Sequence, residues 1–351
     1  MKYLHDVFKE ELSDESNFRL ADGLVYIRSR YWSASDIVEL ARKSDGENEV
    51  FEELFVEWLQ ERIENKVTEA DEILENFEQH DRFSSLIATH KAGSVIPFIG
   101  AGLSIPSGYP GWSHFLRKQR RQTMITEADL EVLLKQGDFE EAAQLIADYQ
   151  GVAFNEAVDS TFGIDRDLAG AIQLLPHIFS GSIVTTNFDN VIERSFKNAG
   201  IAFLDKLSGF GSQTIRRRIA SGERFLLMLH GTAKSGNGRI LTKREYEGQY
   251  ILGNTLEKTI KALCDTHNIL FLGCSLTVDR TLVAIRSYIN VEGHDNLPKH
   301  YAFLAAPDSN DERISRQNAL SKCHIYPIWY PQGSHDESIE ALLIKLHEAT
   351  Q

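Results

Sequence analysis

The sequence predicts an α/β protein with a doubly wound, mostly parallel sheet, preceded by a helical extension and interrupted by helical insertions. Two observations predict this class. From about residue 93 onward, short apolar segments alternate with amphipathic segments, as buried parallel strands alternate with the helices that cover them. Before that point the chain is highly charged and its apolar residues recur at helical spacing. We therefore expect a helical extension over residues 1–90 and an α/β domain over residues 91–351.

The composition limits the classes of protein to consider. The chain has 351 residues, of which 42% are hydrophobic and 25% charged, as in globular proteins. Residues 1–92 contain 11 Lys and Arg against 22 Asp and Glu, so they account for −11 of the net charge of −14. Such a balance disfavours a nucleic-acid partner. The sequence has neither an apolar segment long enough to span a membrane nor a signal-peptide core, so we expect a cytoplasmic location and no membrane partner.

The extension has the pattern of amphipathic helices. In the segment EVFEELFVEWLQERIENKV, Val50, Leu54 and Trp58 recur four residues apart, and the following residues 70–87 continue the helical pattern. Helices with an acidic outer face are suited to oligomer contacts or to a partner protein. We expect the extension to serve one of these purposes.

The α/β domain contains six predicted strands, each short, apolar and followed by turn residues. They are SVIPFIG (94–100), GSIVTTN (181–187), FLLMLHG (225–231), NILFLGCSL (268–276), HYAFLAA (300–306) and CHIYPIWY (323–330). Amphipathic segments between and after them predict helices, including 139–150, 190–200, 279–289 and 338–350.

Small and polar residues follow four of these strands: GAGLS, TTNFD, HG and GCSL. In a doubly wound sheet, ligands bind at the carboxyl ends of the strands, so these residues predict a site. Gly100 and Gly102 would let the backbone approach a diphosphate. The third glycine of the usual dinucleotide fingerprint is replaced by Ile105, and a plain tight turn is the alternative interpretation.

The order of these motifs resembles that of the sirtuin family. The motifs are G-A-G-x-S-x-x-x-G-x-P from Gly100, T-x-N-x-D from Thr185, His230-Gly231, and G-x-S-L from Gly273. The resemblance covers roughly residues 93–330 and implies a Rossmann-like sheet. It leaves the first 90 residues unexplained.

Two departures refine the resemblance. Sirtuin deacylases carry a zinc module of two CxxC pairs, whereas this chain has only three widely spaced cysteines. They also continue the first motif with Asp-Phe-Arg, where this chain has Gly111-Trp112-Ser113. The chain therefore resembles the zinc-free, sirtuin-like NADases of bacterial anti-phage defence. This implies that NAD⁺ is the substrate, that no metal is needed, and that the products are ADP-ribose and nicotinamide.

The resemblance implies roles for individual residues. His230 would act as general base toward a ribose hydroxyl, Asn187 would orient the attacking water and the ribose, and Asp189 would bind the nicotinamide carboxamide. Each also has a structural interpretation: a satisfied strand-end histidine, a helix N-cap, and an acidic residue placed favourably in the helix dipole. The residues implied in substrate binding are Gly100, Ala101, Gly102, Ser104, Thr186, Asp189, Gly231, Gly273 and Ser275.

Two other functions remain open at this stage. The same site could hold NAD⁺ or ADP-ribose without turnover, as a regulatory subunit, or it could serve a protein deacylase, which the missing zinc ligands oppose. The sequence contains no nucleophile elbow, HExxH or P-loop, so any ATPase activity would belong to a partner. The resemblance implies a protein partner, such as a HerA-type ATPase or a short Argonaute protein, and the amphipathic extension favours a homo-oligomer.

Overall fold

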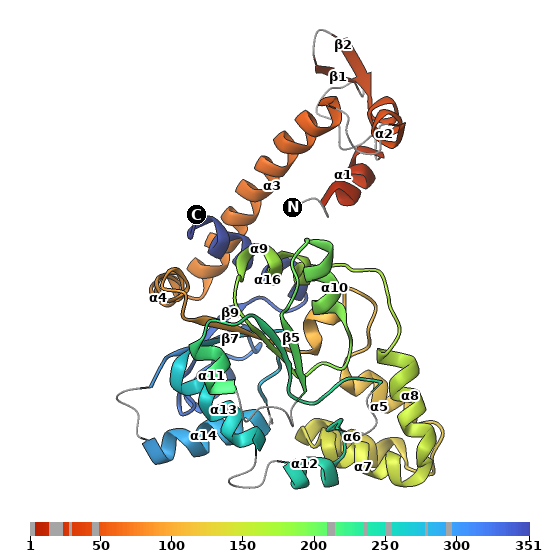
Figure 1. The fold of residues 1–351 in the computed structure, drawn as a ribbon, viewed down its shortest axis with the longest axis vertical. Coiled ribbons are helices and arrows are strands. Elements are labelled where there is room, and N and C mark those ends of the chain that lie inside the picture. The colour runs from red at the N-terminus through yellow and green to blue at the C-terminus, as the bar shows by residue number, and fades with distance from the viewer. Residues whose placement is uncertain are drawn as a thin grey trace. The chain divides into compact units, whose positions relative to one another are not determined.

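The computed structural model describes residues 4–13, 24–27, 30–43, 49–208, 215–234, 238–249, 255–277, 280–292 and 297–351 (Figure 1). The chain divides into two compact units, Met1–Ala70 and Asp71–Gln351. Each unit has its own apolar core.

The first unit combines helices with a small antiparallel hairpin. It contains α1 (Leu4–Ser13), α2 (Ala34–Lys43), most of α3 (Glu49–Asn76), and the strands β1 (Leu24–Ile27) and β2 (Arg30–Ser33). Its core is aromatic, with Phe8, Phe51 and Phe55 in mutual contact, and Trp58 Nε1 donates to Glu11 Oε2 at 2.6 Å. The amphipathic helix predicted from residue 49 is confirmed, but the hairpin was not predicted.

The second unit is built on one parallel sheet of seven strands in the order β5-β6-β4-β3-β7-β8-β9. The predicted doubly wound α/β class is therefore confirmed, and each of the six predicted segments contains a strand. The strands are β3 (Val95–Ile99), β4 (Ile183–Thr185), β5 (Asp205–Ser208), β6 (Phe225–Met228), β7 (Asn268–Leu272), β8 (His300–Ala305) and β9 (Ile325–Tyr330). Only β5 was missed, because it is a polar edge strand whose Asp205 and Lys206 are exposed.

Helices cover both faces of this sheet (Figure 1). One layer contains α4 (His80–Lys91), α9 (Leu175–Ile178), α10 (Val191–Asn198) and α16 (His335–Glu348). The other contains α11 (Ile215–Ala220), α13 (Thr255–Thr266) and α14 (Arg280–Glu292), whose apolar side chains join those of the strands in one buried cluster. Helix α15 (Asn310–Ser321) packs beside β9. None of the helices in the described ranges combines the length and apolar character needed to cross a bilayer.

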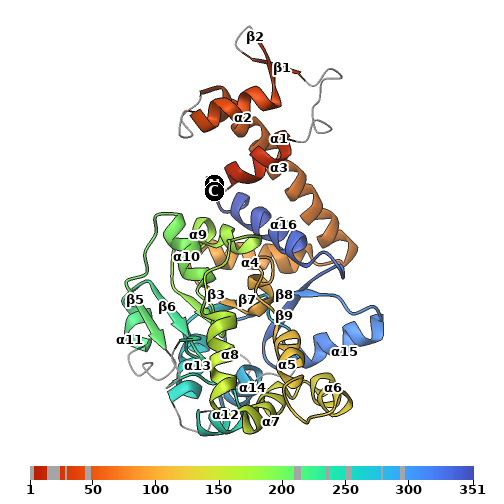
Figure 2. The same cartoon turned by 90° about the vertical axis from the view of Figure 1, so that its right-hand side faces the viewer.

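A helical insertion separates β3 from β4. It begins near the end of β3 with the short 3₁₀ helix η2 (Ala101–Ser104). The α-helices of the insertion follow: α5 (Trp112–Arg120), α6 (Glu127–Gln136), α7 (Phe139–Gln150) and α8 (Val152–Phe162). These helices pack on one another around Phe115, Phe154 and Phe162. Helix α12 (Lys243–Gln249), which follows β6, packs on α7, and Figure 2 shows the two side by side. A second 3₁₀ turn, η3 (Ala171–Leu174), lies between α8 and α9.

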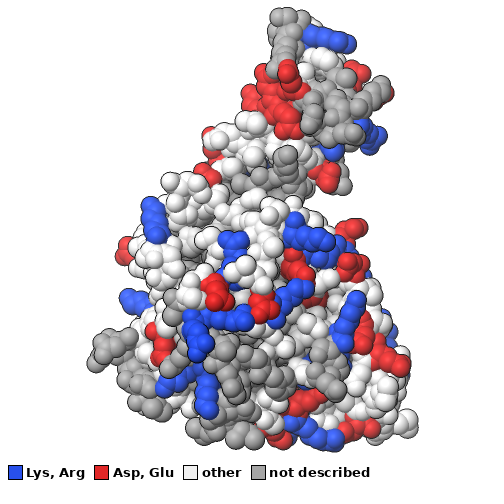
Figure 3. All heavy atoms as spheres, in the orientation of Figure 1, with Lys and Arg blue, Asp and Glu red and all other residues white. Residues whose placement is uncertain are grey.

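Charge is distributed differently over the two units. In Figure 3, acidic side chains gather on the visible face of the first unit, whereas the visible face of the second carries both signs. This distribution agrees with the excess of Asp and Glu in residues 1–92.

Candidate functional site

The four predicted motifs follow four neighbouring strands, β6-β4-β3-β7. The chain changes direction of winding between β3 and β7, which is where doubly wound sheets bind their ligands. Thr185 on β4 pairs with Met228 on β6, so Asn187 and His230, each two residues further on, follow adjacent strand ends in register. Backbone hydrogen bonds, from Leu229 N to Thr185 O at 2.8 Å and from Ala233 N to Phe188 O at 3.1 Å, join the two segments.

The glycines after β3 allow a close approach to the end of β7. Gly100 N donates to Leu272 O at 2.8 Å and Gly102 N donates to Gly273 O at 2.9 Å. A Cβ atom on Gly100 would lie 2.5 Å from Gly273 O, and one on Gly273, where φ is +67°, would lie 2.6 Å from Leu103 N. The absence of side chains therefore brings two backbones together, and the Gly100 and Gly102 amides donate within the fold.

Asn187 connects the segments after β3 and β4. Its Nδ2 donates to Gly100 O and to Ser104 Oγ, both at 3.1 Å. Its backbone N–H donates to Thr185 Oγ1 at 3.0 Å, and that hydroxyl donates to Ile99 O at 2.8 Å. Asn187 is buried, and both of its amide hydrogens are engaged, so Oδ1 is the atom of this side chain that can accept from a ligand or water. The N-cap role considered for Asn187 is wrong, because Asn190 occupies the N-cap position of α10.

Asp189 is the next polar group of the same network. Its Oδ1 accepts from Val191 N at 3.1 Å, at the start of α10. Burial raises the pKa of the Asp189 carboxyl, and hydrogen bonds from Val191 N–H and the Ser104 hydroxyl act in the opposite direction. Ser104 therefore links Asn187 to Asp189, and these hydrogen bonds connect buried side chains at the carboxyl ends of β3 and β4.

His230 lies in a tight turn directly after β6. His230 O accepts from Ile240 N at 3.0 Å, and Gly231 has a φ of +78° with no room for a Cβ, which would lie 2.6 Å from Gly238 O. The imidazole is 6% exposed, and burial lowers its pKa to about 3. The ring is therefore neutral near pH 7. Its Nδ1 lies 3.3 Å from Tyr246 Oη on α12.

The other predicted residues lie around this buried network. Ala101 and Thr186 are half-buried, and Ser275 is exposed. Ser275 Oγ lies 3.4 Å from Thr277 Oγ1, and Arg316 Nη2 donates to the Ser275 carbonyl. The structure thus places the predicted residues at the carboxyl ends of the strands, which form the carboxyl edge of the sheet, and Ser275 is the exposed one among them.

Sequence reasoning missed two members of this edge. Thr185 had a usable signal, since it opens the T-x-N-x-D motif and its hydroxyl accepts from the Asn187 backbone. Tyr246 had none, because it follows His230 by 16 residues on a short helix that no motif marks.

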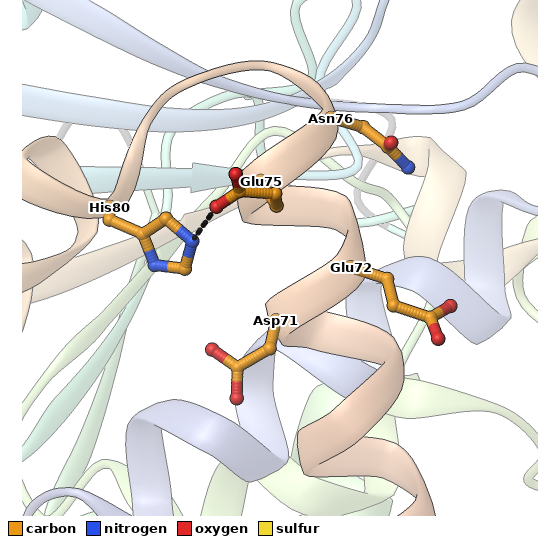
Figure 4. A pocket seen from close by; sticks show the side chains of 5 residues that line it. All are labelled: Asp71, Glu72, Glu75, Asn76 and His80. Carbon is orange, nitrogen blue, oxygen red and sulfur yellow. Dashed lines mark ion pairs between the residues drawn. The ribbon is translucent and has the colours of Figure 1, made fainter.

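Two cavities in the described part of the chain lie away from this edge. One of about 620 Å³ is lined by Asp71, Glu72, Glu75, Asn76 and His80 (Figure 4). Its carboxylates disfavour an anionic ligand, and Figure 4 shows Asp71 and Glu72 pointing in different directions, with Glu75 paired to His80 at 3.2 Å. The other, of about 290 Å³, includes Arg82 and Lys299 at the amino-terminal side of β8 and β9. Within the described ranges, no cluster of three or more His, Cys, Asp or Glu side chains could hold a metal ion.

Comparison with known protein families matches part of this chain. Residues 181–328 match the SIR2-like domain family, which confirms the resemblance predicted from the motifs. The matched range contains three of the four motifs and the strands β4 to β8 with most of β9.

Curated relatives are similar over a larger part of the chain. An NAD(+) hydrolase ThsA from Acinetobacter baumannii (strain 532279) is 28% identical over 225 residues, 62% of this chain and 44% of the relative. The NAD(+) hydrolase ThsA from Enterococcus faecium is 26% identical over 230 residues, 64% of this chain and 45% of the relative. Defense-associated sirtuin 2 from Bacillus subtilis is 25% identical over 191 residues, 52% of this chain and 18% of the relative. The matches thus span less than half the length of these relatives.

Proposed function

We propose that this chain hydrolyses NAD⁺ at the bond between nicotinamide and ribose, giving ADP-ribose and nicotinamide. The observation that carries the proposal is the register of β4 and β6, which places His230 level with Asn187 at neighbouring strand ends, while Ser104 links Asn187 to Asp189. The SIR2-like match and the relatives named NAD(+) hydrolase support it.

The chemistry suits these side chains. The glycosidic bond breaks and its electron pair stays on the nicotinamide nitrogen, so the leaving group is neutral and C1′ becomes oxocarbenium-like. A water oxygen forms the new bond to C1′, and one proton is released overall. His230 accepts a proton from a ribose hydroxyl and so stabilises the positive charge at C1′. The buried imidazole is neutral near pH 7 and so has a lone pair for this proton, but its lowered pKa makes it a weak base, so the imidazolium must be stabilised during the step.

Asn187 and Asp189 would hold the reacting parts in place. Because both Nδ2 hydrogens of Asn187 are engaged, its Oδ1 would orient the attacking water by accepting one of its hydrogens. Asp189, buried beside it, would accept from the carboxamide NH₂ of nicotinamide. Gly100 and Gly102 would contribute by letting the loop after β3 lie directly against β7, instead of through their own amides.

At the cellular level, we propose an anti-phage effector that removes NAD⁺ when activated and that acts with a protein partner in the cytoplasm. The relative named defense-associated sirtuin 2 supports the role in defence. The acidic first unit, which has its own core, is the part of the chain best suited to contacts with a partner or with further copies of the chain.

Turnover of NAD⁺ by the purified protein tests the proposal. Wild type, His230→Ala and Asn187→Ala are compared with the exposed controls His114→Ala and Asn318→Ala, and products are separated by chromatography. Wild type and both controls should form ADP-ribose and nicotinamide without any acyl-peptide, and the two site variants should be slower by roughly 10²–10⁴-fold. Thermal unfolding checks that Asn187→Ala remains folded.

Other results would point elsewhere. Tight binding of NAD⁺ without turnover, in the protein alone and with its partner, would favour the regulatory subunit. Consumption of NAD⁺ only with an acylated peptide would favour the deacylase. In cells infected with phage, an equal fall of NAD⁺ with wild type and with His230→Ala would contradict the role in defence.

A further inference from the structure

Helix α12 brings a phenol to one nitrogen of the His230 ring. Tyr246 Oη lies 3.3 Å from His230 Nδ1, and the two rings meet edge to face with centroids 5.2 Å apart. Tyr246 is half-buried and packs against the main apolar cluster of the sheet unit. Since the two nitrogens lie on different sides of the imidazole, a contact at Nδ1 leaves Nε2 directed elsewhere.

The helical insertion fixes the position of α12. Lys243 Nζ pairs with Glu141 at 2.7 Å, and Arg244 Nη2 pairs with Asp148 Oδ1, also at 2.7 Å. Arg244 N additionally donates to Oε1 of the buried Gln144 at 3.1 Å. Glu141, Gln144 and Asp148 all lie on α7, so the insertion between β3 and β4 fixes the position of α12 and, with it, that of Tyr246.

A side chain of α12 itself also holds the start of the helix. Glu245 Oε2 accepts from Leu241 N at 2.8 Å and from Thr242 N at 2.7 Å. The helix that carries the phenol is therefore held at its start and along the side that faces α7. A side chain on so constrained a segment loses little freedom when it makes a hydrogen bond.

The proton of a neutral imidazole resides on one nitrogen only, and the partner of one nitrogen determines the state of the other. If the phenol oxygen accepts from Nδ1–H, then Nε2 keeps its lone pair and can act as a base. If the phenol donates to Nδ1, the proton resides on Nε2 and the ring has no basic nitrogen for the substrate. Only the first arrangement supports proton transfer to His230.

We propose that Tyr246 is the positioning residue of His230: its phenol oxygen accepts a hydrogen bond from Nδ1–H and thereby keeps Nε2 unprotonated toward the substrate. This inference rests on the proposed hydrolysis of NAD⁺. During the reaction, the proton from the ribose hydroxyl goes to Nε2, the imidazolium forms, and the Nδ1–H bond to Tyr246 stabilises it. The phenol itself neither gains nor loses a proton.

The test combines kinetics with a measurement that does not depend on turnover. Tyr246→Phe keeps the ring and removes only the hydroxyl, and Tyr149→Phe, at an exposed position on α7, is the matched control. In protein labelled with ¹⁵N-histidine, the shifts of the His230 nitrogens report which of them is protonated. We expect Nδ1–H in wild type and in the control, and a shift toward Nε2–H in Tyr246→Phe.

The kinetic expectation follows from the same bond. Loss of an orienting partner typically lowers activity by about 10–100-fold, so kcat of Tyr246→Phe should fall by that factor while KM for NAD⁺ changes little. Asp148→Asn, which removes one ion pair of α12 without touching the site, should show a smaller fall in kcat in the same direction.

The failure of this inference and that of the proposed function are distinguishable. Wild type without NAD⁺ turnover contradicts the proposed function, and the ¹⁵N shifts of His230 still test the Tyr246 pairing. An Nε2–H signature in wild type would overturn the inference. So would Tyr246→Phe with unchanged shifts and unchanged kcat in an enzyme whose wild type turns over.

Discussion

Two buried histidines lie at opposite ends of the strands of the same sheet. His230 follows the carboxyl end of β6, and His300 is the first residue of β8, at the amino edge. Their exposed fractions are 6% and 1%, and burial lowers the pKa of each to about 3. Neither burial nor pKa therefore distinguishes the histidine that we propose as catalytic from the structural one.

The partners of the two rings do distinguish them. His300 Nδ1 accepts from Ile269 N at 3.1 Å, so a backbone donor of β7 fixes its proton on Nε2, and His300 N donates to His324 O at 2.8 Å. His230 faces a phenol, which can accept as well as donate. A backbone N–H partner permits only one tautomer of His300, whereas a phenol is compatible with either tautomer of His230, and the proposed acceptor role of Tyr246 selects Nδ1–H.

The largest expected difference between the two histidines is in catalysis. His230→Gln should lower kcat/KM for NAD⁺ by roughly 10²–10⁴-fold, because glutamine offers no basic nitrogen. His300→Gln should leave kcat/KM within about threefold of wild type, since it changes no group at the carboxyl edge. Product formation by both variants is measured at one pH and one protein concentration.

The two edges also differ in how tightly their backbones are packed. A Cβ on Gly100, at the carboxyl edge, would meet Gly273 O at 2.5 Å and Cys274 Sγ at 2.7 Å, whereas one on Gly181, before β4, would meet nothing within 4 Å. Neither glycine has a positive φ, so the comparison isolates crowding. Gly100→Ala should lower the free energy of unfolding by about 1–3 kcal/mol, and Gly181→Ala by no more than about 0.5 kcal/mol.

Urea unfolding of both variants measures this difference. Equal stabilities would show that the loop after β3 has room to move away from β7. In that case the glycines would be free to serve a ligand, as the sequence first suggested.

The fold was largely predictable because a strand that is buried on both faces of a parallel sheet is a short, continuous apolar segment, which the local sequence shows directly. The segments VIPFI and NILFL, for example, consist of apolar residues that pack on both faces of a sheet. The exceptions are the proline of the first segment and the asparagine that begins the second. The strands β5 and β2 escaped prediction because exposed or half-exposed polar strands lack that signal. The strand β1, LVYI, is apolar but only four residues long, and a short apolar segment does not by itself distinguish a strand from a helix. Helix α4 was expected to belong to the helical extension, yet its Phe83 stacks on Phe303 of the sheet.

The site was predictable only in part, and the reason is geometric. The sequence indicated which polar residues follow strands, and parallel pairing then brought Asn187 and His230 into register. It could not indicate that Gly100 and Gly102 approach Gly273, or that Ser104 joins Asn187 to Asp189. Such contacts depend on loops from distant parts of the chain, whose relative positions no spacing rule gives.

In one measurement the two histidines should behave alike. A histidine whose pKa is about 3 in the folded state and ordinary in the unfolded state, near 6.5, binds its proton only after unfolding over the range between those values. Stability is therefore lost as the pH falls from about 6.5 toward 3, by about 1.4 kcal/mol per pH unit for each such group. Glutamine does not titrate, so His300→Gln and His230→Gln should each flatten the decline by that amount.

Urea unfolding of wild type and of both variants at pH 7.5, 5.5 and 4.5 tests this expectation. At pH 7.5 His300→Gln should be less stable than wild type, because its amide oxygen replaces Nδ1 imperfectly as acceptor for Ile269 N–H. The deficit should shrink at pH 5.5 and again at pH 4.5. If only one of the two histidine variants flattened the decline, the other ring would have to be protonated in the folded protein over the same pH range. For His230, that result would place the folded-state pKa near its ordinary value, so the ring would be charged beside Tyr246 at pH 5.5 and 4.5 but still neutral at pH 7.5.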